Sequence, residues 1–98
     1  MKLSDKTAIV FGCNGQIAKK ICKKLSSEGY KLLVTDLKKE KAEKLASELK
    51  NAIGIGVDVR IENKIREAIE FAIEKFSKID FVINCSRIAL FKETVELT

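Results

Sequence analysis

A glycine-bearing segment near the N-terminus has the residue types of a phosphate-binding turn. Residues 11–18 read FGCNGQIA and lie between a short apolar run and an amphipathic pattern. Gly12 can turn sharply, Gly15 lets a ligand approach the backbone because it has no Cβ, and the small Ala18 permits close packing of a helix on a strand. The free N–H groups and the positive dipole end of that helix favour a pyrophosphate. Taken alone, the segment fits an ordinary strand-to-helix turn as well.

A carboxylate stands where an adenosine ribose would need one. Asp36 follows Gly12 by 24 positions at the end of a second apolar run, close to the spacing of ~20 residues at which an acidic side chain reaches the ribose. The carboxylate can accept hydrogen bonds from both ribose hydroxyls and repels a 2′-phosphate, so its charge favours NAD over NADP. Lys38 and Lys39 partly offset that repulsion. The alternative role for Asp36 is to cap the helix that follows.

Other catalytic chemistry has few candidates in this sequence. The 98 residues include no His, and Cys13, Cys22 and Cys85 form no C-x-x-C pair, so no metal site is expected. Cys13 lies near a helix N-terminus that could lower its thiol pKa, but there is no His to activate it, and packing is the favoured role. The only tyrosine, Tyr30, opens an apolar run and is interpreted as a packing residue.

Four short apolar runs alternate with three helical patterns, and together they must position these residues. The runs are continuous and of strand length, as in a parallel sheet covered on both faces by helices. They cover residues 7–11, 30–35, 52–57 and 79–83. The second helical pattern covers 38–50 and the third 61–77, and a further element starts near Phe91. The alternation predicts an α/β fold with right-handed crossovers.

The first and third helical patterns predict which side chains face the sheet. In the first, the apolar stripe contains Ile17, Ile21 and Leu25, with Ala18 and Cys22 beside it. In the third, a broad apolar face is expected from seven residues: Ile61, Ile65, Ala68, Ile69, Ala72, Ile73 and Phe76. Phe71 falls outside this face.

Composition and charge exclude several classes of partner. The formal net charge is +5, but lysine dominates it and alternates with glutamate along the helical patterns. Solvated helix faces account for this pattern better than nucleic-acid binding. No apolar run approaches the ~20 residues that cross a bilayer, and the N-terminus lacks the hydrophobic stretch of a signal peptide. With its unpaired cysteines, the chain is expected to be a single cytoplasmic domain over residues 1–98, with no membrane partner.

Four segments, taken in order, resemble one family. Over its whole length, the chain resembles the N-terminal part of the short-chain dehydrogenase/reductase family of Rossmann-fold oxidoreductases. The matching segments are residues 12–18, 35–37, 58–59 and 80–86. The resemblance implies a Rossmann-like three-layer α/β/α fold with a parallel sheet of about four strands in the order 3-2-1-4. It also implies that the chain is truncated before the catalytic half of the family.

The resemblance assigns roles to further residues. In the family, the residue at Asp58 binds the adenine amino group, the next backbone amide, that of Val59, assists, and the turn that includes Asn84 borders the cofactor ribose. From the residues alone, Asp58 would be a helix cap and Asn84 a turn residue. The expected cofactor contacts are Gly12, Asn14, Gly15, Gln16, Ile17, Asp36, Leu37, Asp58, Val59, Asn84, Cys85 and Ser86.

Several residues depart from the family pattern. Phe11 stands where the family has Thr, and Gln16 and Ala18 stand where it has glycines. Arg87 lies in a turn where the family has no side chain, and it could clasp a phosphate or obstruct the pocket.

Two functions follow as expectations. In the first, the chain is the NAD-binding part of an oxidoreductase that transfers hydride between nicotinamide and an alcohol or carbonyl carbon. The family's catalytic Ser, Tyr and Lys have no counterpart here, so no catalytic residue is assigned and no turnover is expected from this chain alone. In the second, the chain is a non-catalytic interaction module or a remnant. An open strand edge then predicts a homo-oligomer or pairing with a complementing C-terminal half.

Overall fold

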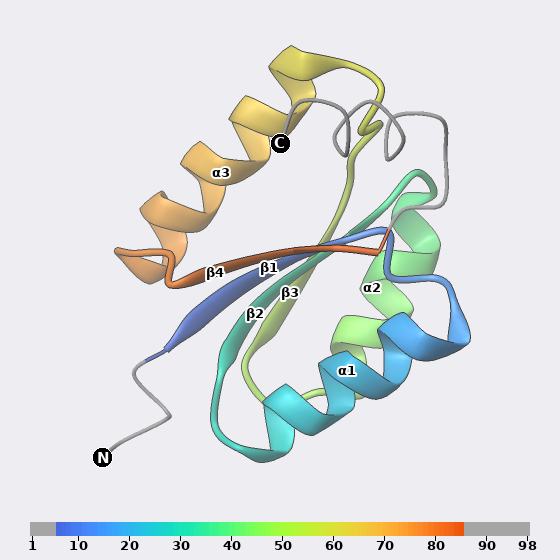
Figure 1. Cartoon of the computed structure of the whole chain (residues 1–98), viewed down its shortest axis with the longest axis vertical. Coiled ribbons are helices and arrows are strands. Elements are labelled where there is room, and N and C mark those ends of the chain that lie inside the picture. The colour runs from blue at the N-terminus through green and yellow to red at the C-terminus, as the bar shows by residue number, and fades with distance from the viewer. Residues whose placement is uncertain (1–5, 86–98) are drawn as a thin grey trace.

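In a computed structural model, which describes residues 6–85, four parallel strands form one sheet (Figure 1). The strands are β1 (Thr7–Phe11), β2 (Lys31–Asp36), β3 (Ala52–Gly56) and β4 (Phe81–Asn84), in the order β3-β2-β1-β4 across the sheet. The helices are α1 (Gln16–Ser27), α2 (Lys39–Ser47) and α3 (Glu62–Phe76). The predicted α/β class and 3-2-1-4 order are confirmed. The element expected near Phe91 lies outside the described residues.

Helices cover the sheet from both sides and give the fold three layers (Figure 1). α1 and α2 pack on one face, and α3 packs on the other. The chain moves outward from β1 through β2 to β3, and then returns through α3 to place β4 on the other side of β1. This reversal makes the carboxyl ends of β1 and β4 a topological switch point, which is where open α/β sheets bind ligands.

The ends of two elements differ from the predicted ranges for local reasons. β4 starts two residues later than expected, because Asp80 first bridges to β1: its N–H donates to the Thr7 carbonyl and its Oδ2 accepts from the Thr7 N–H, both at 2.8 Å. α2 ends at Ser47, three residues early. There the N–H groups of Glu48 and Leu49 bond to carbonyls three residues back, at 2.9 and 3.0 Å, which closes a tight turn.

The core consists of two apolar clusters, one on each face of the sheet. Successive side chains of a strand point to opposite faces. Val10 and Val34 therefore join the cluster beneath α1 and α2, while Ile9 and Leu33 join the cluster beneath α3. All four side chains are fully buried.

α1 packs on the sheet through small residues. Ala18, Cys22 and Ser26 are its buried residues, whereas Ile17 is 74% exposed. Leu25 is partly buried against the first cluster. The prediction that Ile17 faces the core was wrong, because the small side chains let the helix lie close to the sheet and turn the Ile17 position outward.

α3 shows the same preference for small residues at its centre. Ala68 and Ala72 are buried, while Ile61 and Ile73 are exposed. Phe71 is partly buried and packs against the second cluster. The expectations for Ile61, Ile73 and Phe71 were wrong, because the contact is narrower than the apolar face and is centred on the alanines.

α2 approaches β3 most closely at Gly54. A Cβ built on Gly54 would overlap the carbonyl of Ala42, a fully buried residue of α2. Glycine is therefore needed for this contact.

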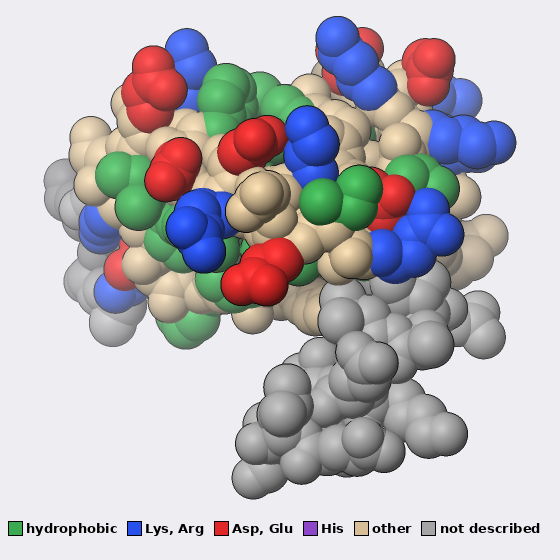
Figure 2. Space-filling model, turned by 90° about the horizontal axis from the view of Figure 1, so that it is seen from above, with side chains coloured by type: hydrophobic (Ala, Val, Ile, Leu, Met, Phe, Trp, Pro, Cys, Tyr) green, Lys and Arg blue, Asp and Glu red, His purple; other side chains and the backbone are tan. Residues whose placement is uncertain are grey.

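Charged side chains of both signs are interspersed on the face shown in Figure 2. Lys24 pairs with Glu28 at 3.3 Å, and Lys39 pairs with Glu43 at 3.8 Å, each one helical turn apart. These lysines lie on solvated helix faces. Within residues 6–85, no helix has the length and apolar character needed to span a bilayer.

Candidate functional site

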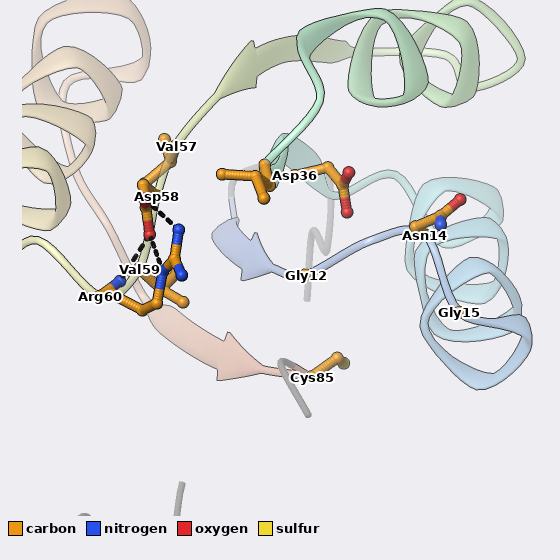
Figure 3. Close-up of a pocket in the computed structure, with 10 residues that line it drawn as sticks. Gly12, Asn14, Gly15, Asp36, Val57, Asp58, Val59, Arg60 and Cys85 are labelled. Atoms are coloured by element: carbon orange, nitrogen blue, oxygen red, sulfur yellow. Dashed lines mark hydrogen bonds and ion pairs between the residues drawn. The ribbon is translucent and has the colours of Figure 1, made fainter. Parts of the chain in front are cut away.

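A pocket of about 390 Å³ opens at the carboxyl ends of the strands (Figure 3). Its walls come from segments that are far apart in the sequence: the turns that follow β1, β2 and β3, and the end of β4. The lining residues are Gly12, Asn14, Gly15, Asp36, Leu37, Val57, Asp58, Val59, Arg60 and Cys85. All except Val57 and Arg60 are among the contacts expected from the sequence.

Backbone geometry fixes the turn after β1. Gly12 has a φ of 79°, a conformation that glycine adopts without steric cost. The N–H groups of Gly12 and Cys13 donate to the Thr35 carbonyl at 3.1 and 2.9 Å, which ties the turn to the end of β2. Gly15 precedes α1 as its N-cap without a side-chain hydrogen bond, and a Cβ built there would meet no atom within 4 Å. The start of α1 thus offers free N–H groups and room for an anion.

Asp36 ends β2 with one carboxylate oxygen engaged. Its Oδ2 accepts a hydrogen bond from the Lys38 N–H at 3.0 Å. α2 begins at Lys39 without a side-chain cap, so Asp36 closes a turn before the helix and does not cap it. Within residues 6–85, the other oxygen of Asp36 accepts no hydrogen bond, which leaves it available to a ligand hydroxyl.

The segment after β3 contains an ion pair that the sequence patterns missed. Arg60 Nε donates to Asp58 Oδ1 and Arg60 Nη2 donates to Asp58 Oδ2, both at 2.9 Å (Figure 3). The Arg60 backbone N–H also donates to Oδ1 at 3.0 Å. The side-chain and backbone hydrogen bonds from Arg60 lower the pKa of Asp58 to about 2. The only sequence signal is an Asp and an Arg two residues apart in a turn.

The turn around Asp58 also settles its alternative role. The carbonyl of Asp58 accepts from the Ile61 N–H at 3.0 Å. Ile61 is the N-cap of α3 and has no side-chain hydrogen bond. Asp58 therefore closes a turn and is not the helix cap that its position alone suggested.

The three cysteines are free thiols with raised pKa values. Cys13 and Cys22 are fully buried, and Cys85 is half-buried in the pocket wall. Burial raises the pKa of Cys13 to about 11, with Asp36 adding to the shift, and that of Cys22 to about 12. Their thiols therefore stay protonated at neutral pH, which fits a packing role. Within the described part of the chain, no three His, Cys, Asp or Glu side chains are grouped to hold a metal ion.

The remaining expected contacts do not line the pocket. Gln16 and Ile17 form the exposed first turn of α1, where their N–H groups belong to the open helix start. Asn84 ends β4 outside the lining. Ser86 and Arg87 lie outside the described residues.

The sequence of the chain matches the model of a known protein family. The family model described as short chain dehydrogenase matches residues 6–98. This chain belongs to the short-chain dehydrogenase family. The resemblance expected from four sequence segments is confirmed.

Curated relatives of this short-chain dehydrogenase chain are considerably longer than it is. An uncharacterized oxidoreductase of Bacillus subtilis (strain 168), YuxG, is 33% identical over 94 residues, which cover 90% of this chain and 14% of that protein. The 7alpha-hydroxysteroid dehydrogenase of Bacteroides fragilis is 32% identical over 90 residues, which cover 85% of this chain and 34% of that protein. The chain thus spans about a third or less of these two relatives.

Solved structures of the same family share the fold. A short chain dehydrogenase from Bacillus anthracis matches with a TM-score of 0.81 and 28% identity, over 88% of this chain and 36% of that one. The 3-ketoacyl-(acyl-carrier-protein) reductase from Brucella melitensis, solved as a complex with NADH, matches with a TM-score of 0.74 and 28% identity. That match covers 79% of this chain and 32% of the reductase.

The chemistry of the pocket residues fits a dinucleotide. The uncapped start of α1 suits a pyrophosphate, and the free oxygen of Asp36 suits a ribose hydroxyl. Leu37, Val57 and Val59 supply apolar surface beside these groups, as a purine ring requires.

Proposed function

We propose that this chain binds the ADP half of a nicotinamide dinucleotide. The observation that carries the proposal is the convergence of the glycine turn, Asp36 and Asp58 on one pocket. Each of these features alone fits an ordinary turn. Together they offer phosphate-binding N–H groups, a ribose acceptor and a base acceptor at the ends of three neighbouring strands. The complex of a related reductase with NADH supports this assignment.

The phosphates are held by the turn after β1. The turn segment Gly12 to Gly15 supplies backbone that a ligand can approach closely, and the N–H groups of Gln16 and Ile17 extend this surface into the first turn of α1. The positive end of the helix dipole adds a favourable term of roughly 0.3–1 kcal/mol for an exposed anion. Gln16 and Ile17 thus act through their backbone, which is consistent with their exposed side chains.

The ribose of adenosine is held by Asp36, and this contact favours NAD over NADP. The free carboxylate oxygen accepts a hydrogen bond from a ribose hydroxyl. A hydrogen bond to a charged group contributes about 1.5–3 kcal/mol. A 2′-phosphate would bring negative charge against the same carboxylate. Lys38 and Lys39 follow in the sequence and are exposed, so they offset only part of that repulsion.

The adenine ring lies between the turns that follow β2 and β3. Leu37 and Val59 pack against its faces, and the Asp58 carboxylate accepts a hydrogen bond from its exocyclic amino group. Asn84 ends β4 and Cys85 follows it, so these two residues lie toward the nicotinamide half.

For a whole short-chain dehydrogenase that contains this segment, we propose hydride transfer between nicotinamide and an alcohol or carbonyl carbon. The bound dinucleotide supplies the hydride chemistry, and the residues of this chain bind and orient its adenosine half. Tyr30 precedes β2 at the opposite end of the sheet from the pocket, and its ring centroid lies 6.0 Å from that of Phe81. The sole tyrosine is thus a packing residue, and this chain alone should not turn over a substrate.

Calorimetric titration of the purified chain tests the binding proposal. We expect saturable binding of NADH and ADP-ribose, with NADPH about tenfold weaker because of its 2′-phosphate. Asp36→Ala should weaken ADP-ribose binding by about tenfold to 100-fold. Glu40→Ala is the matched control, because Glu40 is an exposed acid on α2 outside the pocket. Absence of saturation at millimolar ligand would refute the proposal.

A second candidate function is assembly without cofactor binding. The observation that favours it is the exposure of Phe81 and Val82 on β4, at the edge of the sheet. Open edges with apolar side chains promote pairing with another chain, here a second copy or a complementing C-terminal half. Sedimentation velocity at rising concentration tests it: association with no response to NADH would favour this function, and a strictly monomeric protein would exclude self-association.

A further inference from the structure

Two carboxylates in the pocket have similar turns but different partners. Asp36 and Asp58 each accept the backbone N–H of the residue two positions later, at 3.0 Å in both cases. Asp58 also receives two hydrogen bonds from the Arg60 guanidinium, whereas Asp36 receives none from an arginine. Arg60 itself lines the pocket. The family resemblance assigned no role to Arg60, so its place beside Asp58 needs an explanation.

The two-pronged contact fixes the orientation of the Asp58 carboxylate. A carboxylate offers about four acceptor positions. Oδ1 accepts the Arg60 backbone N–H and Nε, and Oδ2 accepts only Nη2. One acceptor position therefore remains on Oδ2, and the paired bonds prevent the carboxylate from rotating away from its present plane.

The setting of the pair favours a positioning role. The side chain of Asp58 is 23% exposed and that of Arg60 is 66% exposed, so the guanidinium keeps most of its hydration while it holds the carboxylate. Because the two residues are two positions apart in one turn, and the Arg60 N–H shares the same oxygen, little additional chain entropy is lost in forming the pair.

We infer that Arg60 positions Asp58 as a fixed acceptor for the exocyclic amino group of adenine and thereby makes the pocket selective for 6-amino over 6-oxo purines. The inference rests on the proposed binding of the adenosine half. An amino group donates to the remaining position on Oδ2. A 6-oxo group places a second acceptor against that oxygen, and two unpaired acceptors in contact are unfavourable.

The selectivity is tested by titrating the full chain with ADP-ribose and with its hypoxanthine analogue. The wild-type chain should prefer ADP-ribose by at least about tenfold, the value of one hydrogen bond to a charged group. Arg60→Met keeps the length of the side chain but removes both guanidinium contacts, and should lower ADP-ribose affinity by about threefold to tenfold while leaving the analogue unchanged. Arg60→Lys keeps the charge but cannot bond to the carboxylate at two points. Its affinity for ADP-ribose should therefore lie between that of the wild-type chain and that of Arg60→Met.

A control and a ligand-free measurement separate positioning from loss of structure. Arg66→Met removes an exposed arginine of α3 whose only ion pair in the described residues is with Glu62 at 4.0 Å, and it should leave both affinities unchanged. The carboxyl ¹³C resonance of Asp58 should titrate near 2 in the wild-type chain and at a higher pH in Arg60→Met, where only the backbone N–H of residue 60 still bonds to the carboxylate. Because an unfolded chain would also raise the pKa of Asp58, the circular dichroism spectrum of Arg60→Met must match that of the wild-type chain.

The outcomes distinguish the inference from the function on which it rests. If the wild-type chain binds ADP-ribose and Arg60→Met binds it equally or more tightly, Arg60 does not position Asp58 for the base and the inference is overturned, while the proposed function stands. If the wild-type chain fails to bind ADP-ribose, both are overturned. An unchanged Asp58 titration in Arg60→Met also overturns the inference.

Discussion

The two central strands differ from the two edge strands in how completely they are buried. All of β1 and the residues from Leu32 to Thr35 of β2 are buried, whereas β3 is largely half-buried and Phe81 and Val82 of β4 are 47% and 56% exposed. Apolar burial is thus concentrated at the centre of the sheet, while the pocket draws on the carboxyl ends of central and edge strands alike. The difference indicates that stability depends mainly on the buried central strands, whereas ligand contact depends on the carboxyl ends of central and edge strands.

The largest effect is expected at the centre. Leu33 of β2 is fully buried in the cluster beneath α3. Leu33→Ala should lower the free energy of unfolding by about 2–5 kcal/mol, because it removes buried methyl groups and leaves a cavity. Urea denaturation followed by circular dichroism measures the change. A loss below about 1 kcal/mol would contradict the view that the central strands dominate stability.

Gly54 tests whether edge strands are always tolerant. It lies on β3, yet Gly54→Ala should cost about 1–3 kcal/mol, because the new Cβ overlaps the Ala42 carbonyl. Gly56→Ala is the matched control on the same strand, since its Cβ would come no closer to another residue than 3.2 Å, the distance to the Lys39 Cβ. Both variants are compared by the same urea denaturation. Equal losses in the two variants would rule out the close contact as the cause.

Asp80 links edge strand β4 to β1 in a pH-dependent way. The hydrogen bond from the Thr7 N–H lowers the pKa of Asp80. A carboxylate with a lowered pKa stabilises the fold above its unfolded pKa of about 3.9, and that contribution is lost as the pH falls through the folded value.

The pH dependence is measured as the difference in unfolding free energy between the wild-type chain and Asp80→Asn. This difference should be constant from pH 7 to 5 and shrink below about pH 4, where the carboxylate of the unfolded chain takes up its proton. A difference that is the same at pH 6 and pH 3 would show that the charge of Asp80 does not contribute.

The smallest effect is expected at the exposed edge. Val82→Thr changes a side chain that is more than half exposed, so the free energy of unfolding should change by no more than about 0.5 kcal/mol. The same urea denaturation measures it. A loss comparable to that of Leu33→Ala would indicate that Val82 is covered in solution, as the assembly hypothesis requires, and sedimentation would then identify the association.

Prediction from the sequence succeeded where the signal is local to one segment. The apolar runs around Ile9 and Leu33 predicted strands because they are continuous and short. Gly12 predicted a sharp turn, and the structure gives it a positive φ. The cofactor contacts of Asp36 and Asp58 stay predictions, although the structure brings both residues to one pocket.

Prediction failed where the outcome depends on the distance between two elements. Ile17 was expected in the core and is exposed, whereas Phe71 was expected outside it and is partly buried. The apolar pattern of a helix does not show which part of a broad stripe contacts the sheet. Small residues at Ala18 and Ala68 decided the contact, since they allow the helices to come closer than isoleucine would permit.

The sequence by itself determined the alternation of strands and helices, the glycine turn and the acidic residues at strand ends, because apolar spacing and backbone freedom are properties of short segments. Only the tertiary structure decided that Gly54 lies against α2, that the pocket joins three distant turns, and that Arg60 holds both oxygens of Asp58. The first two features depend on close packing between segments that are separate in the sequence, and the third depends on side-chain direction within one turn.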